Sequence, residues 1–153
     1  MNKIFQGIII IFILIILALG GYKYYQSQQG DYALKQKIGQ MLIVGFRGTE
    51  INRTSYISKA MNILNLGGVI LFDKDNPSGQ FPRNITDPEQ TKQLIKNLKE
   101  YSPSPLFVSV DAEGGYVNRL KEKYGFKNIP SAEEMGKGTI EETKNNASTL
   151  SQE

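Results

Sequence analysis

The sequence of 153 residues contains no cysteine and no histidine. The absence of cysteine excludes a disulfide framework, a thiolate zinc site, a catalytic thiol and a lipid anchor on cysteine. The absence of histidine excludes a Ser-His-Asp triad, an imidazole general base and a histidine-ligated metal. The sequence also lacks the glycine-rich loops that bind nucleotide phosphates. We therefore expect neither a metal nor a cofactor.

The sequence also has little net positive charge outside its N-terminus, although its isoelectric point is about 9.0. Residues 1–30 carry Lys3 and Lys23 and no acidic residue, so the rest of the chain holds 16 basic and 15 acidic residues. That remainder has no basic run and no interleaving of basic and aromatic residues. We expect no nucleic-acid partner.

The longest hydrophobic run lies at the N-terminus, where Ile4–Tyr22 contains no charged residue and Lys3 precedes it. A short positive segment before a long apolar one is typical of an export signal. A buried core helix is a poor alternative because the run is apolar on every face. About 20 apolar residues suffice to cross a membrane, which favours an uncleaved signal-anchor. Ala18-Leu19-Gly20 would instead suit a cleaved signal peptide.

These features predict three parts of the chain. They are a signal-anchor or signal peptide at residues 1–25, a polar linker at 26–33 and a domain at 34–153. An anchored chain would be a single-pass protein of the cell membrane, with its domain outside the cytoplasm. A cleaved signal would instead give a secreted domain.

Three short apolar runs in the domain predict buried parallel strands, because they are continuous rather than alternating. They are Met41–Phe46, Val69–Phe72 and Leu106–Val110. Apolar residues at helical spacing lie between them: Ile57, Met61 and Leu64, then Leu94, Ile95, Leu98 and Tyr101. Strands that alternate with helices indicate an α/β fold. The pattern fits the start of a doubly wound sheet or of a (β/α)8 barrel, and periodicity alone does not decide between them.

Local signals mark where helices begin. Asp87 before Pro88, with Gln90 three residues after the aspartate, predicts an N-cap and a capping box. Two further capping boxes, Ser131–Glu134 and Thr139–Glu142, predict helices near the end of the sequence.

The most informative segment follows the third strand, where we expect a loop as far as Gly125. Asp111 comes directly after the strand, at the carboxyl edge where α/β folds bind their ligands. Glu113 precedes Gly114-Gly115, and two glycines let the backbone turn sharply and approach a ligand closely. Arg119 is eight residues after Asp111, so the turn could bring both charged groups to one cavity that holds a sugar. The alternative is that the glycines only form the turn, Asp111 caps it and Arg119 is solvated.

Two other patterns are weaker. Asp73, Asp75 and Asn76 resemble part of a calcium-binding loop, but the spacing fails at Pro77, so we interpret the segment as a solvated turn. Three glycosylation sequons also occur, as chance allows in an asparagine-rich chain. They begin at Asn52, Asn84 and Asn146.

Several segments, in the same order, resemble the N-terminal catalytic domain of glycoside hydrolase family 3, and are closest to its β-N-acetylhexosaminidase branch. The similarity covers about Leu34 to Gly138. The matching segments are Lys37–Phe46, Gly67–Phe72, Pro105–Gly115, Ile129–Ser131 and Met135–Gly136.

The resemblance implies a (β/α)8 TIM-type barrel that hydrolyses β-linked sugars with retention through a glycosyl-enzyme intermediate. By the same resemblance, Asp111 would hydrogen-bond the hydroxyls of a terminal N-acetylglucosamine, and Arg119 would belong to that sugar site. Two residues depart from the family pattern: Ala112 stands where glutamine is usual, and Tyr116 where arginine is common. The implied substrate is a peptidoglycan-derived or chitin-like glycan with a terminal β-linked N-acetylglucosamine.

The chain is short for this fold, because a full barrel needs about 250 residues and 123 follow the first thirty. We therefore expect the first three βα units of an incomplete barrel. In the family, the aspartate nucleophile and the His-Asp acid/base pair lie further downstream, so no catalytic residue is expected before Glu153. The leading hypothesis is part of an exported N-acetylhexosaminidase. The alternatives are a membrane-tethered, catalytically inactive carbohydrate-binding fragment and an unrelated doubly wound binding domain.

Overall fold

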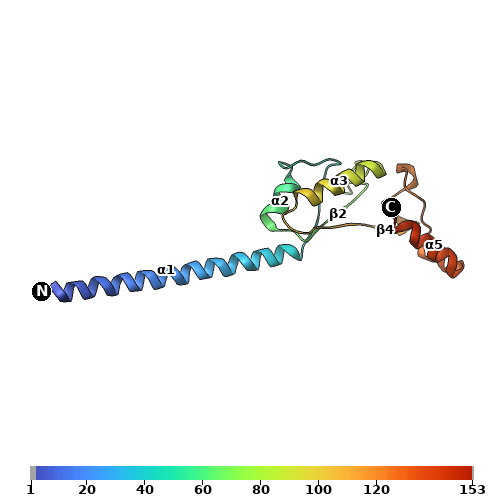
Figure 1. Cartoon of the computed structure of the whole chain (residues 1–153). Helices are drawn as coiled ribbons and strands as arrows, with labels where there is room; N and C mark the ends of the chain where they lie inside the picture. Colours follow the sequence, from blue (N-terminus) through green and yellow to red (C-terminus); the bar gives the residue numbers. More distant parts are fainter. Residues whose placement is uncertain (1–2, 153) are drawn as a thin grey trace. The chain divides into compact units, whose positions relative to one another are not determined.

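The computed structural model of the chain describes residues 3–152 (Figure 1). The chain divides into two compact units, with the boundary between Ile38 and Gly39. The first unit is a single helix, and the second holds the sheet with the helices that cover it.

The N-terminal unit belongs to helix α1, which runs without a break over Lys3–Gln40. Its described apolar side chains are exposed, and it is long and apolar enough to cross a membrane by length and composition. The segment 26–33, expected to be a linker, is helical as well. That segment contains no proline and only one glycine, Gly30, so nothing in it stops a helix from continuing.

The second unit is built on a parallel sheet of strands β1 (Ile43–Gly45), β2 (Gly68–Leu71) and β3 (Phe107–Val110), in that order. The register places Val44 beside Val69, and Val69 beside Val108. Helix α2 (Tyr56–Leu64) connects the first two strands, and helix α3 (Pro88–Tyr101) connects the second and third. The predicted alternation of strands and helices, and hence the α/β fold, is confirmed.

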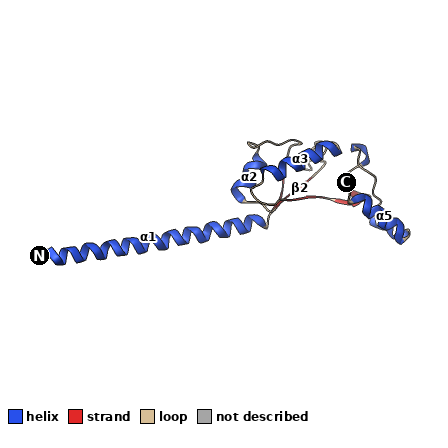
Figure 2. Ribbon diagram, in the orientation of Figure 1, coloured by secondary structure: helices blue, strands red, loops and turns tan. Residues whose placement is uncertain are grey.

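The hydrophobic core lies between the sheet and its two helices, which run along the same side of the strands (Figures 1 and 2). Helix α2 contributes Ile57 and Met61, α3 contributes Leu94 and Leu98, and β2 contributes Val69 and Leu71. These apolar residues recur at helical spacing in α2 and α3, which is why each helix buries one face only.

Burial of the strands differs from the prediction. Strand β2 is buried, but Ile43 of β1 is 57% exposed and Phe107 of β3 is 77% exposed. The expectation that all three strands are buried on both faces is therefore wrong for β1 and β3. The register explains the difference: Ile43 and Phe107 both lie opposite Gly68, on the face of the sheet away from the two helices, whereas Val69 and Leu71 point into the core.

The N-terminus of α3 is capped largely as predicted. The Asp87 carboxylate accepts a hydrogen bond from the backbone N–H of Gln90 at 2.9 Å, and Pro88 is the first helical residue. The Gln90 side chain, however, accepts from the N–H of Thr86 at 2.9 Å, one residue earlier than a capping box requires. The amide group of Gln90 also donates to the carbonyl oxygen of Thr49 at 2.6 Å, so this side chain joins α3 to the loop after β1.

Beyond β3 the chain forms a small antiparallel hairpin that the sequence analysis treated as loop. The hairpin pairs β4 (Ala112–Gly114) with β5 (Val117–Asn118). A short 3-10 helix (Glu122–Tyr124) and the helices α4 (Ala132–Lys137) and α5 (Ile140–Leu150) follow. Both predicted capping boxes are confirmed, at Ser131 with Glu134 and at Thr139 with Glu142.

Candidate functional site

Asp111 and Arg119 lie close together at the carboxyl end of β3. The hairpin folds the chain back, so that the N–H of Arg119 donates to the carbonyl oxygen of Asp111 at 2.8 Å. Their side chains are also close, with Nε of Arg119 3.7 Å from Oδ2 of Asp111. The Asp111 carboxylate is 39% exposed and the Arg119 side chain 25% exposed. Arg119 is thus paired rather than fully solvated, and Asp111 remains accessible to a ligand.

The two glycines of this hairpin have positive φ angles, 79° at Gly114 and 54° at Gly115. A Cβ on Gly114 would overlap the carbonyl oxygen of Pro130, and the N–H of Gly115 donates to Ile129 at 3.1 Å. The close approach that glycine permits here is therefore to the Ile129–Ser131 segment of the same chain. Glu113, between Ala112 and Gly114, is exposed.

Asp73 is a part of this site that the sequence analysis missed. It lies in the loop just after β2, and its side chain is fully buried. Its Oδ2 atom is 2.6 Å from Nζ of Lys121 and accepts a hydrogen bond from the hydroxyl of Tyr124 at 3.4 Å. Its Oδ1 atom is 3.6 Å from Nη1 of Arg119. The prediction of a solvated turn is therefore wrong for Asp73.

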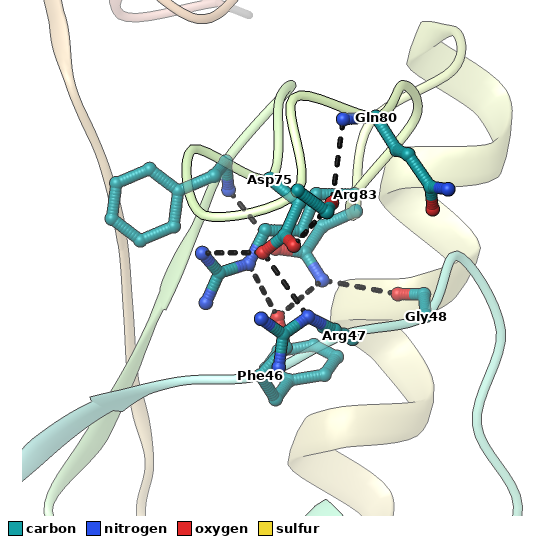
Figure 3. Close-up of polar contacts among 9 residues, drawn as sticks. Phe46, Arg47, Gly48, Asp75, Gln80 and Arg83 are labelled. Carbon is teal, nitrogen blue, oxygen red and sulfur yellow. Dashed lines mark hydrogen bonds and ion pairs between the residues drawn. The ribbon is translucent and has the colours of Figure 1, made fainter.

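The prediction of a solvated turn is also wrong for Asp75, which is almost completely buried. Figure 3 shows the guanidinium groups of Arg47 and Arg83 turned toward the Asp75 carboxylate, at 3.1 and 3.4 Å from Oδ1. The hydroxyl of Ser78 donates to Oδ2 at 2.6 Å. This hydrogen bond, reinforced by Arg47 and by the positive charge of Arg83, lowers the pKa of Asp75 against the opposing effect of burial.

These contacts also explain how the aspartates of the segment that resembles a calcium-binding loop are used. The Asp75 carboxylate faces two guanidinium groups rather than other carboxylates. Within residues 3–152, no group of three or more acidic side chains is placed to hold a metal ion. The arrangement is an ion-pair cluster that fixes the loop.

Asn84 ties the loops after β1 and β2 together and is fully buried. Its side-chain oxygen accepts a hydrogen bond from the N–H of Phe72 at 3.0 Å. Its amide nitrogen donates to the carbonyl oxygens of Gly48 at 3.1 Å and Phe46 at 3.3 Å. Because this amide is buried and occupied, the sequon that begins at Asn84 is a structural feature of the loop and not an accessible acceptor of a glycan.

Phe72 links the two charged clusters at this edge of the sheet. Its ring centroid lies 4.8 Å from the guanidinium carbon of Arg83 and 5.9 Å from that of Arg119. Both distances fall within the range in which a cation is attracted to an aromatic ring. The Arg119 side chain thus contacts an aromatic ring and two carboxylates, and these come from two different loops.

Each of the two buried aspartates faces two cationic side chains. Asp73 is paired with Arg119 and Lys121, and Asp75 is paired with Arg47 and Arg83. Such a set of carboxylate and guanidinium groups can bind hydroxyls and amide oxygens of a polar ligand such as a sugar. The signal that could have revealed Asp73 was present in the sequence, because Asp73, like Asp111, directly follows a predicted strand.

The chain is similar to known glycosidases. Residues 33–152 match the family described as Glycosyl hydrolase family 3 N terminal domain. A beta-hexosaminidase of Haemophilus ducreyi is 33% identical over 99 residues, which cover 63% of this chain and 24% of that protein. A beta-hexosaminidase of Idiomarina loihiensis is 32% identical over 106 residues, which cover 69% of this chain and 28% of that protein.

A solved structure gives the same result. A glycoside hydrolase family 3 beta-N-acetylglucosaminidase from Paenibacillus sp. str. FPU-7 superposes with a TM-score of 0.53 at 32% sequence identity, over 64% of this chain and 17% of that one. The chain thus spans between 17% and 28% of the length of these relatives. The match over residues 33–152, together with this likeness in sequence and structure, shows that the chain belongs to glycosyl hydrolase family 3.

Proposed function

We propose that this chain provides the first sugar-binding residues of a β-N-acetylhexosaminidase that removes terminal N-acetylglucosamine from a β-linked glycan. The observation that carries the proposal is the Asp111–Arg119 pair, whose side chains lie 3.7 Å apart at the carboxyl end of a parallel strand. In α/β folds that edge is where ligands bind. The glycan is either derived from peptidoglycan or chitin-like.

The roles of the two residues follow from their chemistry. An ionised Asp111 accepts hydrogen bonds from two neighbouring hydroxyls of the sugar, and each such charge-assisted bond contributes about 1.5–3 kcal/mol. Arg119 keeps N–H groups beyond those directed at Asp111 and Asp73, and these donate to oxygens of the same sugar. Neither residue forms or breaks a bond.

For the fold we propose that β1, β2 and β3 are the first three strands of a (β/α)8 barrel. The support is their parallel order along the sheet, the connecting helices on one side and the membership of family 3. The same strand order also begins a doubly wound sheet, so strand order alone does not distinguish the two.

The proposed reaction retains the configuration at the anomeric carbon. A retaining glycosidase needs two carboxyl groups about 5 Å apart, one as nucleophile and one as acid and base. We place these catalytic groups outside residues 3–152, on segments that complete the barrel. The alternative is a catalytically inactive, membrane-tethered fragment that only binds carbohydrate.

We further propose that α1 anchors the protein in the cell membrane, with residues 39–153 outside the cytoplasm. Its apolar stretch has a mean hydropathy of 2.2 and is exposed, and the sequence begins with the short positive segment typical of export signals. Cleavage of this segment would instead release a secreted domain.

The proposal is tested by kinetics on a full-length protein with a complete hydrolase domain. Asp111→Ala is expected to lower kcat/KM for a chromogenic N-acetylglucosaminide by at least about 100-fold, from roughly 3 kcal/mol of lost transition-state binding. Arg119→Ala is expected to cost less, because water can partly replace a side chain that is 25% exposed. Asp87→Asn is the control, because asparagine also caps a helix and this cap lies at the start of α3. A folded Asp111→Ala variant with kcat/KM close to that of the wild type would overturn the proposal.

A further inference from the structure

The Asp73 carboxylate has a divided set of partners. Its Oδ2 atom is held by the Lys121 ammonium at 2.6 Å and by the Tyr124 hydroxyl at 3.4 Å. Its Oδ1 atom faces Arg119, with Nη1 at 3.6 Å, and has no hydrogen-bond partner among the residues that the structure describes. Because the carboxylate is fully buried, these partners, and not water, balance its charge.

The Arg119 guanidinium lies between this buried carboxylate and the exposed one. Its Nη1 atom faces Asp73 at 3.6 Å, and its Nε atom faces Asp111 at 3.7 Å. Both distances are longer than a hydrogen bond, and Nε is buried without a hydrogen-bond partner within the described part of the chain. The guanidinium is therefore placed by charge and not by hydrogen bonds to these two carboxylates, and the side chain keeps 25% of its surface exposed.

We infer that Asp73 is a positioning residue, whose buried carboxylate holds the Arg119 side chain in place for the sugar that Asp111 binds. This inference rests on the proposed function of the site. An arginine side chain loses substantial conformational entropy when it is fixed, so a charge that fixes it before the ligand arrives lowers the cost of binding. Asp73 itself is fully buried and does not reach the ligand.

Lys121 determines how the Asp73 carboxylate pairs with Arg119. It occupies Oδ2 of Asp73 at 2.6 Å, so only the other oxygen remains for Arg119. Without Lys121, the carboxylate could take both N–H groups of one guanidinium edge in the bidentate geometry that arginine favours. The partial pairing orients the Arg119 side chain without using all of its hydrogen-bond donors. A guanidinium that binds a ligand needs both properties.

Asp75 provides a matched control in the same loop. It is also buried and also faces two cationic side chains, but these are Arg47 and Arg83 and not Arg119. Asp73→Asn and Asp75→Asn therefore remove the same charge from equally buried positions. Only the first change removes a group that faces Arg119.

The test uses the side-chain Nε–H signals of arginine in NMR spectra of the full chain in detergent micelles. The chain contains four arginines, Arg47, Arg53, Arg83 and Arg119, so each signal can be assigned by its loss in the corresponding lysine variant. In Asp73→Asn we expect the order parameter of the Arg119 group to fall below about 0.6, the range of flexible groups. In Asp75→Asn we expect Arg47 to become mobile and Arg119 to stay ordered, while Arg83 keeps its Nε hydrogen bond to the Phe46 carbonyl oxygen. Arg53, an exposed residue paired with Glu100, should not change in either variant.

The second measurement is the affinity of the same variants for N-acetylglucosamine, by chemical-shift titration. Asp73→Asn should weaken binding about tenfold, Asp75→Asn less than twofold, and the double variant Asp73→Asn with Arg119→Ala no more than Arg119→Ala alone. An Arg119 that stays ordered in Asp73→Asn, or losses of affinity that add in the double variant, would overturn the inference. If Arg119→Ala binds the sugar as well as the wild type, the proposed sugar site fails instead. If no form of the chain binds the sugar, the order parameter of Arg119 alone decides the inference.

Discussion

The side-chain amide of Asn84 donates a hydrogen bond to the carbonyl oxygen of Gly48 at 3.1 Å, although the two residues lie 36 positions apart. The same side chain accepts from Phe72 at the end of β2. One buried amide therefore sets the spacing of the two loops that carry Arg47, Asp73 and Asp75. This spacing brings Arg47, from the loop after β1, to the Asp75 carboxylate in the loop after β2.

The first prediction concerns that amide. Asn84→Ala should lower the free energy of unfolding of the domain by about 2–4 kcal/mol, because it removes a fully buried side chain and leaves the part-buried Phe72 N–H and Gly48 carbonyl without that partner. Chemical denaturation followed by the near-ultraviolet circular dichroism of the tyrosines measures the change. Asn62→Ala is the matched control, since Asn62 is itself exposed and its hydrogen bond to the Tyr101 carbonyl is exposed as well. If both variants lost the same free energy of unfolding, burial of the Asn84 side chain would not be the cause.

The second prediction concerns acid stability. Ser78, Arg47 and Arg83 lower the pKa of Asp75 from its ordinary value of 3.8. A carboxyl group with a lowered folded-state pKa stabilises the protein above its unfolded pKa, and this contribution is lost as the pH falls through the folded pKa. The difference in unfolding free energy between wild type and Asp75→Asn should thus be constant above about pH 5 and shrink below 3.8.

The control for this pH series is Glu113→Gln, at an exposed residue of β4. Its stability should follow that of the wild type at every pH. A difference between wild type and Asp75→Asn that grew on acidification would show that the sign is wrong.

The third prediction concerns the hairpin glycines. Gly114→Ala should destabilise the domain by roughly 2–3 kcal/mol, because alanine is strained at positive φ and its Cβ would overlap the Pro130 carbonyl oxygen. Gly136→Ala is the control, because a Cβ there meets no atom within 4 Å and alanine favours a helix. Thermal unfolding should give a lower Tm for the first variant and an equal or higher Tm for the second.

The fourth prediction concerns the 153-residue chain on its own. We expect no measurable hydrolysis of a chromogenic N-acetylglucosaminide, because loss of the nucleophile and the acid/base group removes several orders of magnitude of rate. A full-length family 3 hexosaminidase assayed beside it shows that the assay works. Robust turnover by the purified chain, with contaminating enzyme excluded by an inactive preparation of the Asp111→Ala variant, would contradict this assignment.

The fifth prediction concerns location. Protease added to intact cells should digest residues 39–153 if α1 holds them on the outer side of the membrane. The apolar stretch within α1 should remain protected by the bilayer. Protection of the domain until the cells are lysed would argue against export, and its recovery from the medium would indicate a cleaved signal.

The strands, the two core helices and the pair Asp111 and Arg119 could be predicted because each depends on residues close together in the sequence. A buried run such as Val69–Phe72 identifies its own strand, and a turn of eight residues brings Arg119 back to Asp111. The exposure of Ile43 and Phe107 depends on which face of the sheet the helices cover, so it could not be predicted from the strand residues alone.

The buried aspartates show a different limit. Asp73 lies 48 positions before its partner Lys121, and Arg47 reaches Asp75 from a different loop. A polar segment rich in aspartate, proline and glycine is usually a solvated turn, and its only local distinction is that Asp73 directly follows a predicted strand. Only the fold brings the cations that make burial of both carboxylates tolerable.

The short contact between Lys121 and Asp73 has a consequence for related sequences. A fully buried carboxylate without its cation is destabilising, so selection should act on the two positions jointly. Among family members with a loop of this length after the second strand, an acidic residue at position 73 should occur with a basic residue at 121. Relatives that carry a neutral residue at 73 should be free to vary at 121, and their counterpart of Arg119 should depend on some other neighbour for its orientation.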